Sequence, residues 1–249
     1  MNANRVLIIA EAGVNHDGSL EKAIELVDIA AKAGADAIKF QTWITEDIAT
    51  QDAPKAAYQV QNDGAQNSQY EMLKRLELSY ADFRKVKKIC DDKKIIFLST
   101  PDEKKSLDFL VDELGMSMIK IGSGEITNIG FLRDVGRKNR TVILSTGMST
   151  LEEVERAVHE LRSSGAKDIR VLHCTSAYPA SFEHLNLKAM ITMKSALNLP
   201  IGYSDHSLGT EVSVAAVALG AQIIEKHFTY DSNAKGPDHA ASLNPDELK

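Results

Sequence analysis

Short runs of apolar, often β-branched residues recur along the whole chain. They are apolar nearly throughout instead of alternating with polar residues, which is typical of strands that are covered on both faces in a parallel sheet. The runs occupy residues 6–10, 37–40, 95–99, 118–121, 142–145, 169–173, 201–203 and 223–228. The sequence therefore predicts a parallel sheet of eight strands.

Helical patterns lie between these runs. Residues 19–33 carry apolar side chains at helical spacing, residues 150–161 begin with a Thr-x-x-Glu capping box, and residues 209–219 form a third such segment. Each of the three ends in a glycine-containing turn of the kind that closes helices. Because strand and helix alternate along the whole chain, we expect an α/β protein with the (β/α)8 architecture of a TIM barrel.

Two stretches depart from this plan. Residues 45–67 form the longest irregular segment, and we expect a functional loop that folds over the mouth of the barrel, with a disordered insertion as the alternative. Near the end, Asn244 and Pro245 suit the first positions of a helix, yet the sequence stops at Lys249. The pattern thus predicts a barrel that is truncated before its last helix.

Composition narrows the class of protein. The 249 residues suit one barrel-sized domain, and a formal net charge of −6 with a pI of about 5.7 favours neither a nucleic acid nor a membrane partner. No run approaches the roughly 18 apolar residues of a membrane span, and the amino-terminal run lacks the cationic start of a signal peptide. We therefore expect a cytoplasmic protein.

Cys90 and Cys174 are too few for a disulfide framework, and Cys174 is expected to be a reduced core thiol.

Polar residues gather where the predicted strands end. In a barrel of this kind, the carboxyl ends of the strands carry the catalytic groups. Since the amino ends are poor in polar residues, this asymmetry indicates one site at the carboxyl-terminal mouth. The residues at these ends are Glu11, Asn15, His16, Lys39, Gln41, Ser99, Thr100, Lys120, Ser123, Glu125, Ser145, Thr146, His173, Cys174, Thr175, Ser176, Tyr178, Ser204, Asp205, His206, Glu225, Lys226 and His227.

Two lysines stand out because they lie in buried strands. A buried lysine needs a partner, which favours a phosphate or carboxylate ligand at Lys39 over a solvated or salt-bridged side chain. With neighbouring hydroxyls and glycine-rich backbone, Lys39 and Lys120 would form an anion-binding cradle. Lys120 also has the position of a Schiff-base nucleophile, as in class I aldolases, and the sequence leaves this alternative open.

Two histidines end neighbouring strands. The imidazoles of His206 and His227 could converge on one divalent ion such as Mn, Fe, Co or Zn, with water and substrate completing an open coordination sphere. The spacing alone is a weak signal, because a single histidine is more often a core or surface residue. His173, which has apolar neighbours, is expected to be structural.

Several motifs, taken together and in order, resemble the N-acetylneuraminate (sialic acid) synthase family, which includes legionaminic and pseudaminic acid synthases. The resemblance covers essentially the whole chain and is specific as a set. The motifs are IAEAGVNHDG at 9–18, AIKFQT at 37–42, KIGSGE at 120–125, LSTGM at 144–148, HCT at 173–175, YSDH at 203–206, EKHF at 225–228 and KGPD at 235–238.

The resemblance implies a metal-dependent transferase of carbohydrate biosynthesis. Such enzymes condense phosphoenolpyruvate with N-acetylmannosamine or a related acetamido sugar to a nine-carbon 2-keto acid and release phosphate. The resemblance assigns phosphoenolpyruvate binding to Lys39, Thr100, Lys120, Ser123, Ser145 and Ser204, and sugar binding to Gln41, Glu125, Tyr178 and Asp238. It assigns acid–base roles to Glu11 and Glu125, and the metal, typically Mn²⁺ with Mg²⁺ or Co²⁺ as alternatives, to His206 and His227.

The resemblance also implies a longer protein. Residues 1–249 would be the catalytic barrel, and the small antifreeze-like (SAF) domain that follows it in the family is absent from this sequence. Family members form domain-swapped dimers, so a homodimer is expected of a full-length protein.

Ser176 stands where some members carry asparagine and others serine, so this position does not decide which acetamido sugar is the substrate. The alternatives are an octulosonate- or heptulosonate-phosphate synthase, a Schiff-base pyruvate aldolase, and a barrel that binds ligand without turnover.

Overall fold

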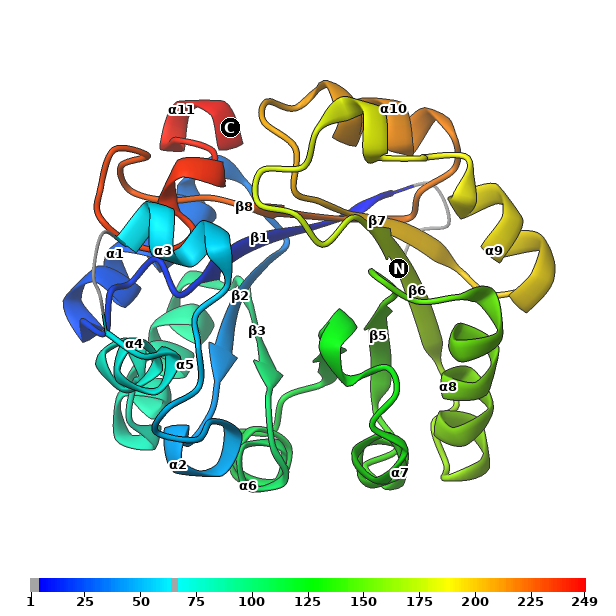
Figure 1. Cartoon of the computed structure of the whole chain (residues 1–249), viewed down its shortest axis with the longest axis horizontal. Coiled ribbons are helices and arrows are strands. Elements are labelled where there is room, and N and C mark those ends of the chain that lie inside the picture. Colours follow the sequence, from blue (N-terminus) through cyan, green and yellow to red (C-terminus); the bar gives the residue numbers. More distant parts are fainter. Residues whose placement is uncertain (1–4, 64–66) are drawn as a thin grey trace.

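Eight parallel strands form one curved sheet in a computed structural model that describes residues 5–63 and 67–249 (Figure 1). The hydrogen-bonded order is β3-β2-β1-β8-β7-β6-β5-β4, and the two end strands, β3 and β4, lie next to each other, so that the sheet nearly closes on itself. The predicted (β/α)8 barrel is confirmed. The strands are β1 (Leu7–Gly13), β2 (Ala37–Thr42), β3 (Ile96–Pro101), β4 (Met118–Ile121), β5 (Thr141–Ser145), β6 (Ile169–Cys174), β7 (Ile201–Asp205) and β8 (Ile223–His227).

Helices surround this sheet, as the ring of coiled ribbons in Figure 1 shows. The helix predicted over 19–33 begins after Ser19, whose hydroxyl accepts from Lys22 N, and ends at Gly34 with φ 85°. The predicted Thr150–Glu153 capping box is also present. The outer helices are α1 (Leu20–Ala33), α5 (Tyr80–Lys93), α6 (Lys104–Asp108) with a π-helical turn (Phe109–Glu113), α7 (Ile129–Arg137), α8 (Leu151–Ser163), α9 (Ala189–Leu197), α10 (Glu211–Ala218) and α11 (Pro245–Leu248).

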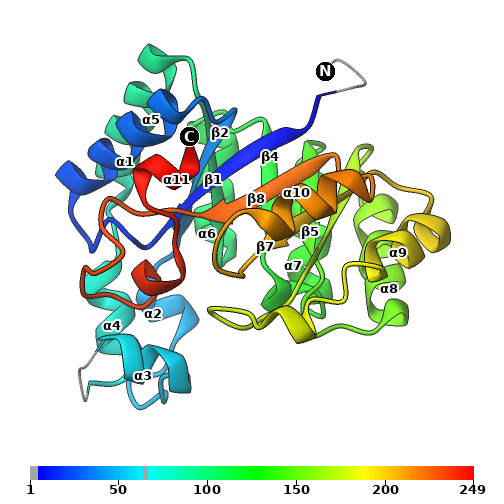
Figure 2. The same cartoon turned by 90° about the horizontal axis from the view of Figure 1, so that it is seen from above.

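The prediction of an irregular stretch over 45–67 is wrong in part. The described residues of this stretch form α2 (Thr45–Ile48) and α3 (Ala57–Asp63), and α4 (Gln69–Leu76) follows; residues 64–66 lie outside the described part of the chain. Figure 2 shows α2, α3 and α4 together at the end of the barrel opposite the amino terminus. The segment therefore packs at the carboxyl-terminal mouth.

Alternation along each strand decides which side chains enter the barrel. In β2, Ile38 and Phe40 are buried against the helices, and the Phe40 ring lies 6.3 Å from Phe83 of α5. Lys39 and Gln41, one residue out of phase, point to the inside. One continuous apolar core joins the strands to the helices around them. This core fixes the strands, and the strands fix the interior side chains.

The end of the chain follows the predicted pattern. Asn244 and Glu247 form a capping box at the start of α11, and Pro245 is its first residue. Among the described residues, no helix is both long and apolar enough to cross a membrane. Cys90 and Cys174 are free thiols, and both are buried.

The barrel wall allows no side chain at Gly202 of β7. A Cβ there would lie 2.5 Å from the Ile223 carbonyl oxygen and 2.6 Å from Leu172 Cδ2. We expect Gly202→Ala to lower the free energy of unfolding by about 1–3 kcal/mol, because the wall must expand. Gly130→Ala is the matched control, since its Cβ would meet nothing closer than 3.8 Å. Urea unfolding of the two variants is the measurement, and equal stabilities would contradict the expectation.

Candidate active site

A cavity of about 470 Å³ opens at the carboxyl ends of the strands. It collects eleven of the thirteen side chains that the sequence assigned to a site, and they come from all eight strands or the loops that directly follow them. They are Glu11, Lys39, Gln41, Thr100, Lys120, Ser123, Ser145, Tyr178, Ser204, His206 and His227. Residues distant in sequence therefore meet in one place.

The other two predicted residues do not line this cavity. Glu125 lies in a 3-10 turn (Ser123–Glu125), and its Oε2 accepts a hydrogen bond from Asn128 Nδ2 at 2.8 Å. Asp238 is buried just behind the cavity wall. A Cβ built on Gly13, where φ is 52°, would lie 3.4 Å from Glu11 Oε1 and 3.6 Å from Asp238 Oδ2. Asp238 and Glu11 thus both border Gly13, whereas Glu125 is held by Asn128 outside the cavity lining.

Four buried charges line the floor of the cavity. Lys39 Nζ lies 2.7 Å from Glu11 Oε1 and 3.9 Å from Glu225 Oε2, and it donates to Thr100 Oγ1 at 3.1 Å. Lys120 Nζ lies 3.5 Å from Glu225 Oε1 and donates to Ser145 Oγ at 2.7 Å. The expectation that Lys39 is not salt-bridged is therefore wrong. A buried ammonium group is stable only with a counter-charge, and Glu11 supplies it from the adjacent strand in register.

The four charges shift each other's pKa values. Burial raises the pKa of Glu11 even though Lys39 opposes the shift. Burial alone would also raise the pKa of Glu225, but Lys120 and Lys39 outweigh it and hold this pKa at about 2. Burial lowers the pKa of Lys120, with only partial compensation from Glu225. The two glutamates thus differ in how firmly they hold a negative charge.

The two predicted metal ligands face the same cavity. Their ring centroids are 5.7 Å apart. His206 Nδ1 donates to the carbonyl of Thr175 at 2.7 Å, so in the neutral ring Nε2 keeps its lone pair. The Nδ1 atom of His227 is buried without a hydrogen-bond partner. Burial lowers the pKa of both rings, which keeps them in the neutral form that binds metals.

Two histidines alone would form an open site. Among the described residues, no group of three or more His, Cys, Asp or Glu side chains is arranged to hold a metal ion. The pair nevertheless fits the sequence expectation, in which water and substrate provide the remaining ligands.

Gly147 brings the β5 and β6 loops into close contact. Its N–H donates to Ser123 Oγ at 2.9 Å, and a Cβ at this position would lie 2.2 Å from Ser176 Oγ and 3.1 Å from Cys174 Sγ. Cys174 was expected to be a core thiol. It is buried and free, but it also lines the cavity, 3.2 Å from Ser123 Oγ.

Sequence reasoning missed several residues of the cavity. Glu225 was noted only as a strand-end residue, although a carboxylate after Ile223 and Ile224 carries the same signal of a buried charge as Lys39 does. Asp102 also lines the cavity, and burial raises its pKa to about 7. Its position directly after a predicted strand is the signal that was available.

Tyr58 of α3 is another such residue. Its ring stacks on Tyr178 with a centroid distance of 5.4 Å, and Asn62 Nδ2 donates to the Pro237 carbonyl at 2.8 Å. The described part of the 45–67 stretch therefore does fold over the mouth, as expected. A tyrosine between Ala57 and Gln59 gives no sequence signal for this contact.

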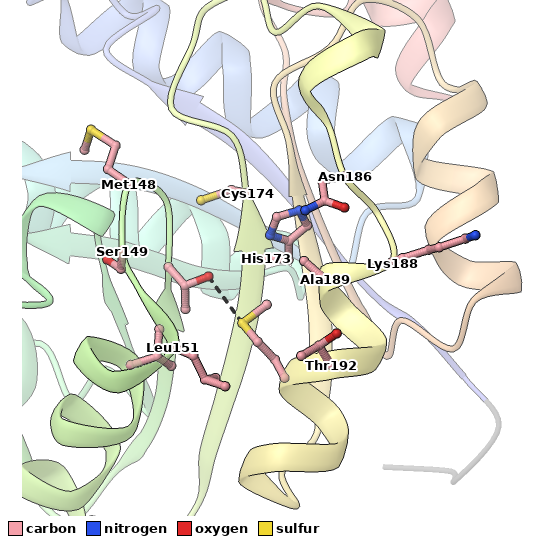
Figure 3. A pocket seen from close by; sticks show the side chains of 12 residues that line it. Met148, Ser149, Leu151, His173, Cys174, Asn186, Lys188, Ala189 and Thr192 are labelled. Atoms are coloured by element: carbon pink, nitrogen blue, oxygen red, sulfur yellow. Dashed lines mark hydrogen bonds between the residues drawn. The ribbon is translucent and has the colours of Figure 1, made fainter.

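A second cavity, of about 440 Å³, lies outside the barrel between α8 and α9. Figure 3 shows His173, Cys174, Met148 and Thr192 around it. The Nε2 atom of His173 donates to the Leu185 carbonyl at 2.7 Å, which agrees with the structural role predicted for this ring. Met148 and Cys174 line both cavities, so only these side chains and their neighbours separate them.

Comparison with known proteins shows the family to which this chain belongs. The model of the NeuB family matches residues 26–249. The chain is also 49% identical to the N,N'-diacetyllegionaminic acid synthase of Campylobacter jejuni, over 98% of this chain and 74% of that protein. The chain belongs to the NeuB family. Within this family it is 36% identical to a pseudaminic acid synthase of Campylobacter jejuni, over 98% of this chain and 71% of that protein.

Solved NeuB-type structures agree with this fold. The N-acetylneuraminic acid synthetase of Leptospira borgpetersenii superimposes with a TM-score of 0.88 at 39% identity, covering 98% of this chain and 80% of that one. The resemblance predicted from the motifs is therefore confirmed for family and fold. The roles of single residues in this NeuB-family chain remain predictions.

The Glu11–Lys39 pair gives a prediction on stability. We expect Lys39→Met to lower the free energy of unfolding by about 1–3 kcal/mol at pH 7, because it leaves a buried carboxyl group without its partner. Burial already raises the pKa of Glu11 above its ordinary 4.5, and removing Lys39 raises it further. In folded wild type the pKa of Glu11 is raised to about 8, and the folded variant keeps the proton above that pH. Its deficit against wild type should therefore grow as the pH rises through about 8.

Urea unfolding at several pH values measures this deficit. The double variant Lys39→Met/Glu11→Gln carries no unpaired carboxylate and should recover part of the loss. A deficit that is independent of pH would show that the ion pair is not its cause.

Proposed function

We propose that this chain condenses phosphoenolpyruvate with an acetamido sugar to a nine-carbon 2-keto acid of the sialic acid type and releases phosphate. The observation that carries the proposal is a single cavity in which two buried lysines and several hydroxyls lie beside two neutral histidines. An anion and a polarised carbonyl group can be held there together. Membership of the NeuB family supports the same reaction class.

The lysines and hydroxyls suit phosphoenolpyruvate. Its carboxylate and phosphate need cationic and hydroxyl donors, and Lys39 and Lys120 are the cationic side chains that line this cavity among the described residues. In our proposal, Thr100, Ser123, Ser145 and Ser204 supply the neutral donors. Lys39 must then exchange Glu11 for the substrate.

His206 and His227 would hold a divalent metal ion, Mn²⁺ with Mg²⁺ or Co²⁺ as alternatives, which would polarise the aldehyde of the open-chain sugar as a Lewis acid. The Thr175 carbonyl fixes the His206 ring for this role, because it holds the proton on Nδ1.

Glu11 is suited to proton transfer. It is buried, burial raises its pKa, and its Oε2 atom has no hydrogen-bond partner. A carboxyl group of this kind can take a proton from an attacking water molecule near neutral pH. In our proposal Glu11 is the acid–base group beside the reacting carbons, with Glu125 as the more distant candidate.

We propose that the sugar lies beside Glu11, between Gln41 and Tyr178, with Asp238 as a further sugar-binding residue behind the cavity wall. The relative from Campylobacter jejuni is a diacetyllegionaminic acid synthase by name. The sugars to test are therefore N-acetylmannosamine and its 6-deoxy diacetamido analogue.

Phosphate release from phosphoenolpyruvate tests this function directly. We expect release with at least one of the two sugars in the presence of Mn²⁺, and none with EDTA. The sugar that supports release identifies the product class. A folded protein that releases phosphate with neither sugar would contradict the proposal for residues 1–249.

His206 gives a test of the metal role. We expect His206→Ala to lower metal-dependent turnover by more than about a hundredfold, because one of two protein ligands is lost. Mn²⁺ affinity measured by calorimetry should fall in parallel. His159→Ala, on the exposed face of α8, is the matched control. Wild-type activity that persists after chelation would refute the metal role.

One observation favours a second candidate function. Burial lowers the pKa of Lys120, which makes an amine more nucleophilic, as a Schiff-base aldolase requires. Such an enzyme would be inactivated by borohydride in the presence of pyruvate and would not need a metal. Mass spectrometry of Lys120 after borohydride treatment separates the two candidates.

A further inference from the structure

Glu225 is a buried carboxylate to which the proposed reaction has so far given no role. It lies on β8 and lines the cavity. Its Oε1 atom accepts from Ser204 Oγ at 2.9 Å and lies 3.5 Å from Lys120 Nζ. Its Oε2 atom lies 3.9 Å from Lys39 Nζ and has no hydrogen-bond partner. The carboxylate therefore stands between the two lysines.

A negative charge at this point opposes the binding of an anion. Lys39 already has a counter-charge in Glu11, at the shorter distance of 2.7 Å. A glutamine at position 225 could keep the hydrogen bond to Ser204 without repelling phosphoenolpyruvate. A site selected only for anion affinity would therefore not place a carboxylate here, and its presence calls for a role in a later step.

The shape of phosphoenolpyruvate indicates that step. Its carboxylate and its phosphate ester oxygen are both attached to one carbon atom, C2. If the two lysines bind these two anionic groups, C2 lies between the lysines. The structure holds the Glu225 carboxylate within 4 Å of both ammonium groups and fixes it through Ser204, so this carboxylate would lie beside C2.

We propose that Glu225 stabilises the positive charge that develops at C2 of phosphoenolpyruvate. The inference rests on the proposed synthase function. The C2=C3 electron pair forms the new bond to the aldehyde carbon, the aldehyde oxygen takes the proton of Glu11, and C2 is left as a cation shared with the ester oxygen. Water adds to C2 and returns a proton to Glu11. The C2–O bond to phosphate then breaks with its electron pair on the phosphate oxygen, and the leaving phosphate takes the proton of the remaining hydroxyl, which gives the keto group.

A fixed charge beside the site where charge develops acts on the transition state more than on the bound substrate. A purely structural role makes a different prediction. If Glu225 only keeps the lysines in place, its loss should weaken phosphoenolpyruvate binding together with turnover. If it stabilises the cation, turnover should fall while binding holds or tightens.

The experiment compares wild type with Glu225→Gln, using calorimetric Kd for phosphoenolpyruvate alone and kcat for phosphate release at saturating Mn²⁺ and sugar. We expect kcat to fall by about 10²–10³-fold, with Kd unchanged or up to tenfold tighter. Glu160→Gln is the matched control, because Glu160 pairs with Arg133 on the outer helices at 2.8 Å. It should keep both values.

Each outcome decides the question. A kcat within threefold of wild type overturns the role of Glu225, and so does a joint loss of kcat and affinity. If Glu225→Gln does not fold, Glu225→Asp replaces it as the test because it retains the charge. We expect Glu225→Asp to keep kcat within about tenfold of wild type and to keep the wild-type Kd. A weaker Kd together with a larger loss of kcat overturns the proposal. Absence of turnover in wild type itself would instead refute the synthase function.

Discussion

The structure depends on one constraint, the burial of two lysines and two glutamates inside a barrel. An uncompensated charge in this position would be costly, and even a paired one gains little over an apolar side chain. The cluster is nevertheless complete, because Glu11, Lys39, Lys120 and Glu225 each contact an opposite charge within 4 Å. Such a cluster persists where function requires it, and it requires a rigid scaffold to hold its geometry.

The barrel supplies that rigidity through register. Glu11 and Lys39 are paired residues of neighbouring strands, so their side chains leave the sheet at the same height on the same face. Glu225 lies on the other neighbour of β1, two residues before His227, and both point to the interior. Glu11 is in register with both Lys39 and His227, so the ion pair and this histidine lie at the same height, and Glu225 lies two residues earlier on β8. A shift of one residue in the register would turn these side chains outward.

The loops at the mouth are fixed by a separate network. Asp17, after β1, accepts hydrogen bonds from Lys22 Nζ at 2.8 Å and from Tyr230 OH at 2.7 Å, and its other oxygen lies 3.1 Å from His239 Nε2. Asp238, beside this histidine, is thereby held close to the cavity. The contacts of Asp17 with Tyr230 and His239 could not be predicted from the sequence, because they join segments more than 200 residues apart through side chains that follow no period.

Much of the fold was predictable because the spacing of apolar residues along the sequence indicates which side chains are buried. The apolar runs located every strand, the helical spacing of apolar residues located α1, and a capping box located α8. The same signal identified Lys39, since a charge inside an apolar run must have a partner. It could not identify Glu11 as the carboxylate that Lys39 contacts at 2.7 Å, because that carboxylate comes from another strand. The 45–67 stretch was misjudged because its helices are short and gain their stability from packing at the mouth, which local sequence does not encode.

Glu11 and Glu225 show why residue identity alone cannot assign chemistry. Both are buried glutamates on adjacent strands, and both contact Lys39. Glu11 has one lysine near it, and burial raises its pKa; Glu225 lies between two lysines, which hold its pKa at about 2. When their surroundings give two carboxyl groups different pKa values, the groups can take different roles. One can exchange a proton near neutral pH, and the other remains ionised. The second lysine, Lys120, causes that difference, and it comes from the opposite side of the barrel. The different roles of the two glutamates therefore depend on the closed barrel, and no local sequence motif determines them.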